Sequence, residues 1–393
     1  MSKSNPQIVL DSFALTKSFQ LGPVVKNTLV PDSFTKSQHF YLKTWREQSV
    51  SNGTWGSTWN WLTPESLNVV SSHFLEIPLP AIGGGSYKAI PGLYAIRGIK
   101  LLSNGSEVYD LDYRAYLREF MSSLSDEELR QFVDCYMGGK VANGAGRTIC
   151  CPLPLPNSHY LRRHVHKSFG IFPHKTRARI EFQIHMGTAE EMAAQGSGNP
   201  DTIANLAQIV TREVKGDQNS VTRKYSDARG VYTVMVPRFQ VVVDWKQLNA
   251  STSDKVKAVL PTGSCYEFIC EAYPSAHTLV ETERNTAILP TYYSIECDGE
   301  LVRVLDSELR VKQELFSNGY RSNDTVNNAA RICFADQTSN SDTCFRGALN
   351  CANVSAIQTD VTFAENVRYR ILAKKYSKVR IESTGVMRTS FDG

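Results

Sequence analysis

Histidine is the residue type whose spacing in this chain comes closest to a chemical site. Five of the eight histidines lie within residues 159–185, and His164 and His166 would share one face of a strand, a spacing that suits two imidazole ligands of a metal ion. No cysteine or carboxylate stands at ligand spacing beside them, and the neighbouring Arg162 and Lys167 would repel a dication. We therefore favour a solvated or intersubunit basic loop whose histidines titrate between about pH 5 and 8.

Tryptophan is the second residue type with a binding chemistry. Four of the five tryptophans lie between Trp45 and Trp61, in a segment that ends Trp-Gly-Ser-Thr-Trp-Asn-Trp. Exposed indole rings beside Asp, Asn or Gln could stack on sugars, whereas buried rings would fill a core or a subunit interface. We favour packing and keep a carbohydrate site as the alternative.

Motifs of catalysis are missing from the sequence. It contains no Gly-x-Ser-x-Gly, no His-Glu-x-x-His, no phosphate loop ending in Gly-Lys-Ser/Thr and no Cys-x-x-Cys. The glycines within 83–85 and 144–146 predict turns, because their spacing does not suit a pyrophosphate. Cys150 and Cys151 are expected on opposite faces of an extended segment, and the acidic pair at 190–191 on a solvated helix surface. We predict no enzyme and name no catalytic, cofactor-binding or metal-binding residue.

Length and composition predict a globular protein of two domains. The chain has 393 residues, of which 41% are hydrophobic and 21% charged, and this is more than one core usually organises. The nine cysteines form no regular framework, and the N-terminus lacks the apolar core of a secretion signal, so we expect reduced thiols in an intracellular setting. No run approaches the roughly 18 to 20 apolar residues of a membrane span, so we do not expect an integral membrane protein.

Strands dominate the local pattern. Apolar and polar residues alternate strictly from Arg177 to Met186, which predicts a half-buried strand. Other β-rich runs, separated by Gly, Pro, Asn and Ser, cover residues 38–43, 74–79, 93–102, 231–245, 265–272 and 301–305. Many short strands with turns between them indicate a sandwich or barrel.

Two helices are predicted as insertions in the loops of such a sandwich. Ser125-Asp-Glu-Glu128 is a capping box, in which the Ser and Glu side chains satisfy free amides of the first turn, and Gly138-Gly139 would end this helix. The second helix is expected roughly from Asp201 to Val214. Its apolar residues at helical spacing are Ile203, Leu206, Ile209 and Val210.

Positive charge is concentrated near the end of the chain. The formal net charge is only +4, but seven cations stand against the single acid Glu382 in the segment 368–388. We favour a solvated strand face over a phosphate-binding patch for this segment. The cations are Arg368, Arg370, Lys374, Lys375, Lys378, Arg380 and Arg388.

Six short segments occur in an order that carries further information. They are His73–Ile82, Gly92–Asp110, the capped helix with Tyr136–Gly139, Ile149–Pro156 with the strand from Arg177, Val241–Phe268, and Gly347–Asn353 leading to Val367–Ser383. In this order they resemble the double jelly-roll major capsid proteins of nucleocytoplasmic large DNA viruses and of the adenovirus and tectivirus lineage. The resemblance spans roughly residues 35–385. Asn157–Tyr160 departs from it, because an aromatic-rich stretch usually follows the Pro-Leu-Pro segment, and so does Cys351, which stands where an aromatic is usual.

The resemblance implies an all-β chain of two consecutive eight-stranded jelly-roll sandwiches with short helices inserted in loops. The polar stretch 249–257 ends a strand, and this predicts a first jelly roll over residues 1–257 and a second over 258–393.

The resemblance also implies a virion protein, made and assembled inside the host cell, that forms homotrimeric, pseudo-hexagonal capsomers of an icosahedral DNA-virus shell. Its partners would be neighbouring capsomers, penton and minor capsid proteins, with contact of the basic C-terminal segment to the genome or inner components. A minor capsid component of the same fold is a variant of this hypothesis. The alternative is a carbohydrate-binding or carbohydrate-active β-sandwich protein.

Overall fold

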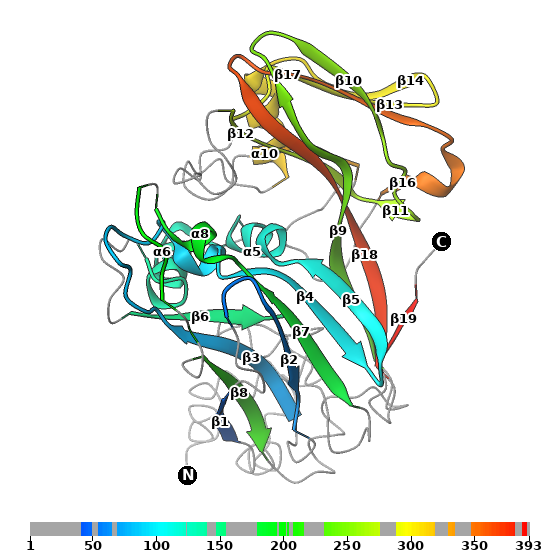
Figure 1. Ribbon diagram of the computed structural model, residues 1–393. Helices are drawn as coiled ribbons and strands as arrows, with labels where there is room; N and C mark the ends of the chain where they lie inside the picture. Colours follow the sequence, from blue (N-terminus) through cyan, green and yellow to red (C-terminus); the bar gives the residue numbers. More distant parts are fainter. Residues whose placement is uncertain are drawn as a thin grey trace, which may run out of the picture.

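Antiparallel strands make up most of the protein, and the helices are few and short, which confirms the all-β prediction (Figure 1). The computed structural model describes residues 41–48, 54–64, 69–122, 124–139, 147–154, 179–194, 196–201, 203, 207–215, 232–275, 288–318, 329–334, 347–381 and 387–390.

The first half of the chain folds into a sandwich of two four-stranded sheets. Its strands are β1 (Tyr41–Gln48), β2 (Thr58–Leu62), β3 (Val69–Pro78), β4 (Ile96–Ser103), β5 (Ser106–Asp112), β6 (Thr148–Leu153), β7 (Ile180–Met186) and β8 (Gln208–Lys215). The sheet orders are β1-β8-β3-β6 and β2-β7-β4-β5. This is the order of an eight-stranded jelly roll.

The second half repeats the same topology. Its strands are β9 (Tyr232–Leu248), β10 (Ser253–Ala258), β12 (Glu267–Pro274), β13 (Tyr292–Cys297), β14 (Glu300–Leu305), β15 (Ala330–Cys333), β17 (Ile357–Thr362) and β18 (Val367–Ile381). The sheet orders are β9-β18-β12-β15 and β10-β17-β13-β14, so each strand has a counterpart at the same place in the first sandwich. A ribbon of β11 (Ser264–Cys265) and β16 (Leu349–Asn350) and the strand β19 (Met387–Ser390) are additions.

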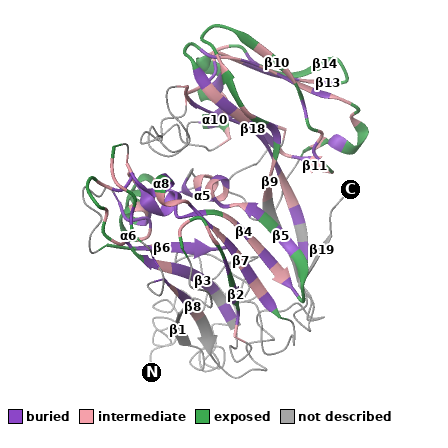
Figure 2. Ribbon diagram, viewed as in Figure 1, coloured by how far each residue is buried: buried purple, intermediate pink, exposed green. Residues whose placement is uncertain are grey.

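Each sandwich encloses its own hydrophobic core between its two sheets (Figure 2). The alternation predicted around β7 is confirmed, since Ile180, Phe182, Ile184 and Met186 are buried and the residues between them are only half-buried. The second core is centred on large rings, among them Phe268. Burial of these apolar side chains is the main source of stability for each sandwich.

The capped helix is confirmed as α6 (Asp126–Cys135). The Ser125 amide donates to Glu128 Oε2 (2.7 Å), and the Glu128 amide donates to Ser125 Oγ (3.3 Å). Gly138 and Gly139 follow with φ values of 88° and 63°, a conformation that glycine adopts without strain and that ends the helix. The other helices are α5 (Tyr113–Ser122), α8 (Ala189–Met192), α10 (Glu308–Ser317) and the short 3-10 turns η1 (Pro91–Leu93) and η3 (Cys351–Asn353).

The helix predicted over Asp201–Val214 is wrong, because residues 208–215 form strand β8. This strand pairs with β1 on one side and β3 on the other. Ile209 faces the core and Val210 packs on the opposite face against Phe74, so both faces of β8 are apolar. β-Branched residues fit such a pleated, doubly covered strand better than a helix.

The passage between the two jelly rolls is defined by strand pairing. β9 pairs with β18 over its whole length, and β10 pairs with β17, so both strands belong to the second sandwich. Val242, Val243 and Ala258 lie in the second core. We therefore propose that the chain crosses between β8 and β9, instead of after residue 257. Residues 249–252 of the polar stretch form the corner at which the chain passes from one sheet of the second sandwich to the other, and residues 253–257 belong to β10.

Candidate functional site at the junction of the two jelly rolls

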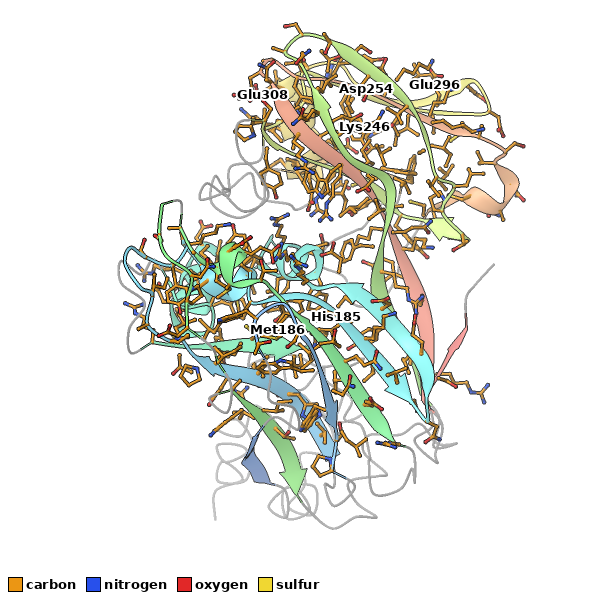
Figure 3. The ribbon with its side chains drawn as sticks, in the orientation of Figure 1. His185, Met186, Lys246, Asp254, Glu296 and Glu308 are labelled. Carbon is orange, nitrogen blue, oxygen red and sulfur yellow. The ribbon has the colours of Figure 1, made fainter. Side chains whose placement is uncertain are left out.

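The histidines singled out from the sequence do not come together as a site that the structure describes. His164 and His166 lie outside the described residues. His185 is half-buried on β7, where its Nδ1 lies 2.9 Å from Thr58 Oγ1 (Figure 3). Within the described ranges, no group of three or more His, Cys, Asp or Glu side chains is placed to hold a metal ion.

Packing is confirmed as the role of the two tryptophans on β2. Trp59 and Trp61 expose only 1% and 2% of their surface, and Trp61 packs edge-on against His73. Trp55 is half-buried, and its Nε1 donates to the carbonyl oxygen of Asp201 (3.0 Å). A sugar needs an exposed ring face, and neither strand tryptophan offers one.

Cys151 is buried and Cys150 only half-buried, which confirms that the two thiols point to opposite faces of β6.

The solvated position predicted for Glu191 is wrong. This side chain accepts from Arg97 Nε (2.8 Å) and pairs with Arg114 Nη2 (3.0 Å). Burial opposes its ionisation, but the two arginines and the amide of Thr188 outweigh that effect and lower the pKa of Glu191 to about 2.

The solvated face predicted for the basic C-terminal segment is wrong for two of its cations. Lys374 and Arg370 point from β18 toward the first jelly roll, and their side chains expose only 1% and 12% of their surface. Arg380, further along the same strand, is exposed. The buried cations belong to a junction between the sandwiches, in which helix α5 of the first jelly roll packs on β12, β15 and β18 of the second.

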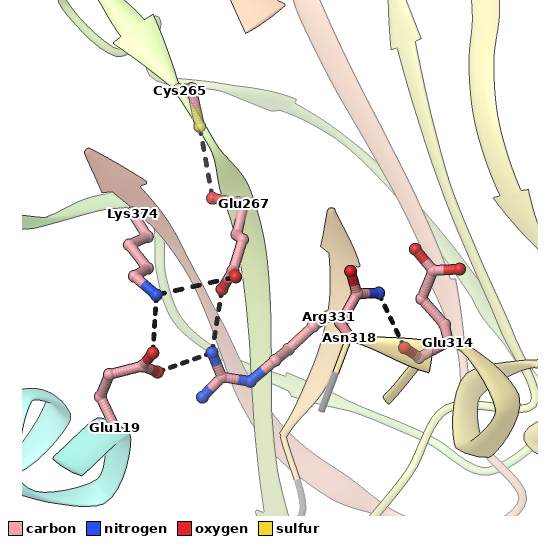
Figure 4. Close-up of polar contacts among 7 residues, drawn as sticks. All are labelled: Glu119, Cys265, Glu267, Glu314, Asn318, Arg331 and Lys374. Carbon is pink, nitrogen blue, oxygen red and sulfur yellow. Dashed lines mark hydrogen bonds and ion pairs between the residues drawn. The ribbon is translucent and has the colours of Figure 1, made fainter. Parts of the chain in front are cut away.

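One half of this junction is a closed cycle of four charged side chains (Figure 4). Glu119 on α5 accepts from Arg331 Nη1 (2.7 Å) and from Lys374 Nζ (2.6 Å). Glu267 on β12 accepts from the same Arg331 atom (2.9 Å), and its other oxygen lies 3.7 Å from Lys374 Nζ. Each carboxylate therefore touches both cations, so all four charges are paired within the protein.

The other half is a chain of ion pairs. Glu271 on β12 accepts from Arg118 Nη1 of α5 (3.0 Å) and from Arg370 Nε of β18 (2.6 Å). Arg370 also donates through Nη1 to Asp112 Oδ2, at the end of β5 (3.2 Å). This chain of ion pairs joins the two jelly rolls a second time, four residues along β12 and β18 from the cycle.

An apolar contact separates the two ionic halves. Ile269 and Leu372 face each other across β12 and β18, and Ala115 of α5 packs on them. The cross-strand pairs on either side are Glu267 with Lys374 and Glu271 with Arg370. The outer face of the second sandwich therefore presents an apolar centre with charges on both sides, and α5 packs on this centre through Ala115.

Electrostatics keep the acids of the junction ionised. Burial by itself disfavours the charged form of Glu119, but Arg331 and Lys374 outweigh it and lower the pKa of Glu119 to about 2. Burial acts in the same way on Glu271, and Arg370 with Arg118 lowers its pKa to about 2. Four carboxylates meet four cations, so the junction is neutral and leaves no excess charge for an anionic ligand. The carboxylates are Asp112, Glu119, Glu267 and Glu271, and the cations are Arg118, Arg331, Arg370 and Lys374.

Sequence reasoning missed this junction, although one signal was present. Glu267 and Glu271 interrupt the otherwise apolar strand β12, and an acid in a buried run needs a partner. The partners lie on α5, β15 and β18, more than 60 residues away in each direction along the chain. A single sequence does not show which distant cations supply them.

Two jelly rolls of equal topology, joined side by side by one buried junction, define a double jelly-roll protein. The sequence matches no protein-family model and no curated protein. Solved structures share the fold. The Faustovirus major capsid protein superposes with a TM-score of 0.66 at 9% identity, over 96% of this chain and 99% of that one.

Two further structures extend the likeness. The capsid model of the virus PBCV-1 gives a TM-score of 0.65 at 10% identity, over 90% of this chain and 97% of that one. The mavirus major capsid protein gives 0.55 at 8% identity, over 88% and 90%. The chain has the double jelly-roll fold of these viral capsid proteins, as the resemblance predicted. None of the helices that the structure describes is long and apolar enough to cross a membrane.

Proposed function

We propose that this protein is a major capsid protein whose homotrimers form pseudo-hexagonal capsomers of an icosahedral DNA-virus shell. The observation that carries the proposal is the repeated strand order, together with the buried junction that fixes the second jelly roll beside the first. Two similar towers per chain give six per trimer, and such six-sided blocks tile the faces of an icosahedral shell with copies of one gene product. The solved structures of the same fold are capsid components, which supports a structural role and not an enzymatic one.

The further partners follow from this role. Neighbouring capsomers, penton proteins and minor capsid proteins would contact the trimer in the virion, after assembly inside the host cell. The composition of the basic C-terminal segment suggested contact with the genome, but two of its cations are not available for it. Arg370 and Lys374 neutralise acids of the junction. Such a contact would depend on the remaining cations, of which Arg380 is exposed.

The carbohydrate alternative loses two of the four tryptophans that motivated it, Trp55 is half-buried, and the side chain of Trp45 lies outside the described part of the chain. Trp59 and Trp61 fill the first core and offer no ring face to a sugar. We therefore retain the capsid function alone.

The solution mass of the purified full chain tests the proposal. Light scattering on a sizing column at two protein concentrations should give three times 43.9 kDa, with six-sided particles in negative-stain images. A monomer at both concentrations that binds an oligosaccharide would contradict the capsid function and restore the alternative.

A further inference from the structure

The core of the second jelly roll is rich in cysteine. Five of the eight free cysteines in the described part of the chain are buried in it. Two of them, Cys265 and Cys351, are brought together by the short ribbon of β11 and β16 (Figure 1). The other three are Cys270, Cys297 and Cys333.

The register of this ribbon places both thiols on its inner face. Cys265 pairs with Leu349, and the amide of Cys351 donates to the carbonyl oxygen of Gly263 (3.1 Å). Cys351 therefore lies opposite Gly263, which makes it the diagonal neighbour of Cys265 across the ribbon. Residues two apart along a strand share a face, and here that face is the core, since Cys265 and Cys351 expose only 0% and 3% of their surface.

The two sulfur atoms differ in their surroundings. Cys265 Sγ lies 3.3 Å from the carbonyl oxygen of Glu267 (Figure 4), and burial raises the pKa of this thiol well above its ordinary value. Contact with the Cys265 thiol lowers the pKa of Cys351, and although burial opposes this, the Lys375 ammonium adds to it. Lys375 is held at the ribbon, because its Nζ donates to Thr262 Oγ1 (2.7 Å). A thiolate beside a cation is the reactive form of cysteine, so Cys351 is the nucleophile of the pair.

We propose that Cys265 and Cys351 form a disulfide when the folded protein meets a low-molecular-weight disulfide such as oxidised glutathione. The Cys351 thiolate attacks one sulfur of the oxidant, whose S–S bond breaks, and one glutathione thiolate leaves. Cys265 then attacks Cys351 Sγ in the mixed disulfide, and its proton goes to the second departing glutathione. Two protein thiols are oxidised, and one glutathione disulfide is reduced to two glutathione molecules.

The end of the ribbon can close by the amount that the bond requires. Diagonal neighbours in a regular ladder have Cα atoms about 7 to 8 Å apart, whereas a disulfide needs about 4.4 to 6.8 Å. Cys351 is the first residue of the turn η3, and Ala352 and Asn353 in this turn are exposed. Because the turn lies at the surface, it can move to admit the oxidant and to bring the two sulfurs together.

The bond would staple the two sheets of the second sandwich to each other. Cys265 directly precedes β12, which belongs to one sheet, and Cys351 precedes β17, which belongs to the other. The loop that it closes contains β12, β13, β14, α10 and β15, and a disulfide that closes a long loop constrains the unfolded chain strongly. The bond does not depend on the capsid function. If that function holds, the thiols would stay reduced during assembly in the host cell and oxidise after release.

Peptide mapping of the full-length wild-type chain tests the bond. The folded protein is incubated with oxidised glutathione, free thiols are alkylated, and the unfolded chain is cut with trypsin and a glutamate-specific protease. Cleavage after Glu267 separates Cys265 from Cys270, so a peptide pair linked through Cys265 and Cys351 identifies the disulfide. The exposed Cys135 reports that the oxidant has reacted. If Cys135 is modified while Cys265 and Cys351 are both alkylated, or if Cys351 is linked to Cys297, the proposal is overturned.

Thermal unfolding tests the staple. The oxidised wild type should unfold at least about 5 °C above the reduced wild type. Cys265→Ser and Cys351→Ser should lose this difference, whereas Cys297→Ser, the matched control in the same core, should keep it. Each variant is compared with itself in both redox states, so the cost of the substitution cancels. A linked chain without a higher midpoint would overturn the staple. A monomeric chain would overturn the capsomer function and leave both of these readouts unchanged.

Discussion

Glu119 on α5 lies 2.6 Å from Lys374 on β18, although 255 residues separate them in the chain. The pair joins the two jelly rolls at a buried position, where an ion pair is stable only if each charge has a close partner. Arg331 and Glu267 provide those partners by closing the cycle. Such a junction tolerates little displacement, so it fixes one jelly roll at a defined position beside the other.

Removal of one member of the cycle should destabilise the protein strongly. Arg331 is 2% exposed, and Arg331→Met would leave Glu119 and Glu267 with Lys374 as their only partner in the cycle. The expected loss is about 3 to 5 kcal/mol in the free energy of unfolding, because uncompensated buried charge remains. Denaturant titration followed by tryptophan fluorescence measures it.

Lys246→Met provides the control for this change. Lys246 pairs with Asp254 at 3.3 Å, but its side chain is 44% exposed. A surface pair of this kind contributes about 0 to 1 kcal/mol. If the two variants lost equal stability, the cycle would be no more important than a surface pair.

Acid should weaken the junction in a defined pH range. The pKa of both Glu119 and Glu271 is lowered from 4.5 to about 2, so their contribution is fully present above pH 4.5 and is lost as the pH falls toward 2. Each contributes on the order of 3 kcal/mol by this shift. Unfolding measured at steps between pH 5 and 2 should show a shallower decline for Glu119→Gln than for wild type. Parallel curves would contradict the role of this carboxylate.

The burial of His73 should make the stability of the protein depend on pH in a higher range. It is fully buried, with Nδ1 at 2.8 Å from Thr211 Oγ1, and burial lowers its pKa from 6.5 to about 3. The unfolded chain takes up this proton below pH 6.5 and the folded protein does not. Stability should therefore fall by about 1.4 kcal/mol per pH unit below 6.5 until the pH reaches the folded pKa.

The double variant His73→Leu with Thr211→Val tests this mechanism. It replaces a buried hydrogen-bonded pair by apolar groups of similar shape, a change that is often nearly neutral at pH 7. Stability measured between pH 6.5 and 5 should become independent of this site, while the acid loss below pH 4.5 persists. A variant that keeps the wild-type slope above pH 5 would show that another group is responsible.

Local sequence patterns predicted a large part of the fold, but they could not predict contacts between residues far apart in the chain. Alternation identified β7, and the capping box at Ser125 identified α6, because both depend on residues close in sequence. β8 was mistaken for a helix because both of its faces are covered, so its apolar residues do not alternate. The partner of Glu119 depends on how two complete sandwiches are placed, and no local pattern encodes that placement.

Close packing at Gly187 gives a prediction that depends only on sterics. A Cβ at this position would overlap the carbonyl oxygen of Tyr94, which is backbone and has little freedom to move. The Gly187 amide donates to Ala95 O (2.8 Å), and its carbonyl accepts from Gly56 (2.8 Å), so the segment is also held from both sides. Gly187→Ala should therefore lower the free energy of unfolding by about 1 to 3 kcal/mol or more.

Gly83→Ala is the matched control for that substitution, because a Cβ at Gly83 meets no atom within 4 Å. Its effect should stay within about 0.5 kcal/mol, as for ordinary surface changes. Both variants change one glycine to alanine and lose the same backbone freedom in the unfolded chain, so the difference between them isolates the overlap with Tyr94. Equal midpoints in denaturant titration would mean that the β7 end can shift away from Tyr94 at no cost, and that the close contact does not fix the position of β7.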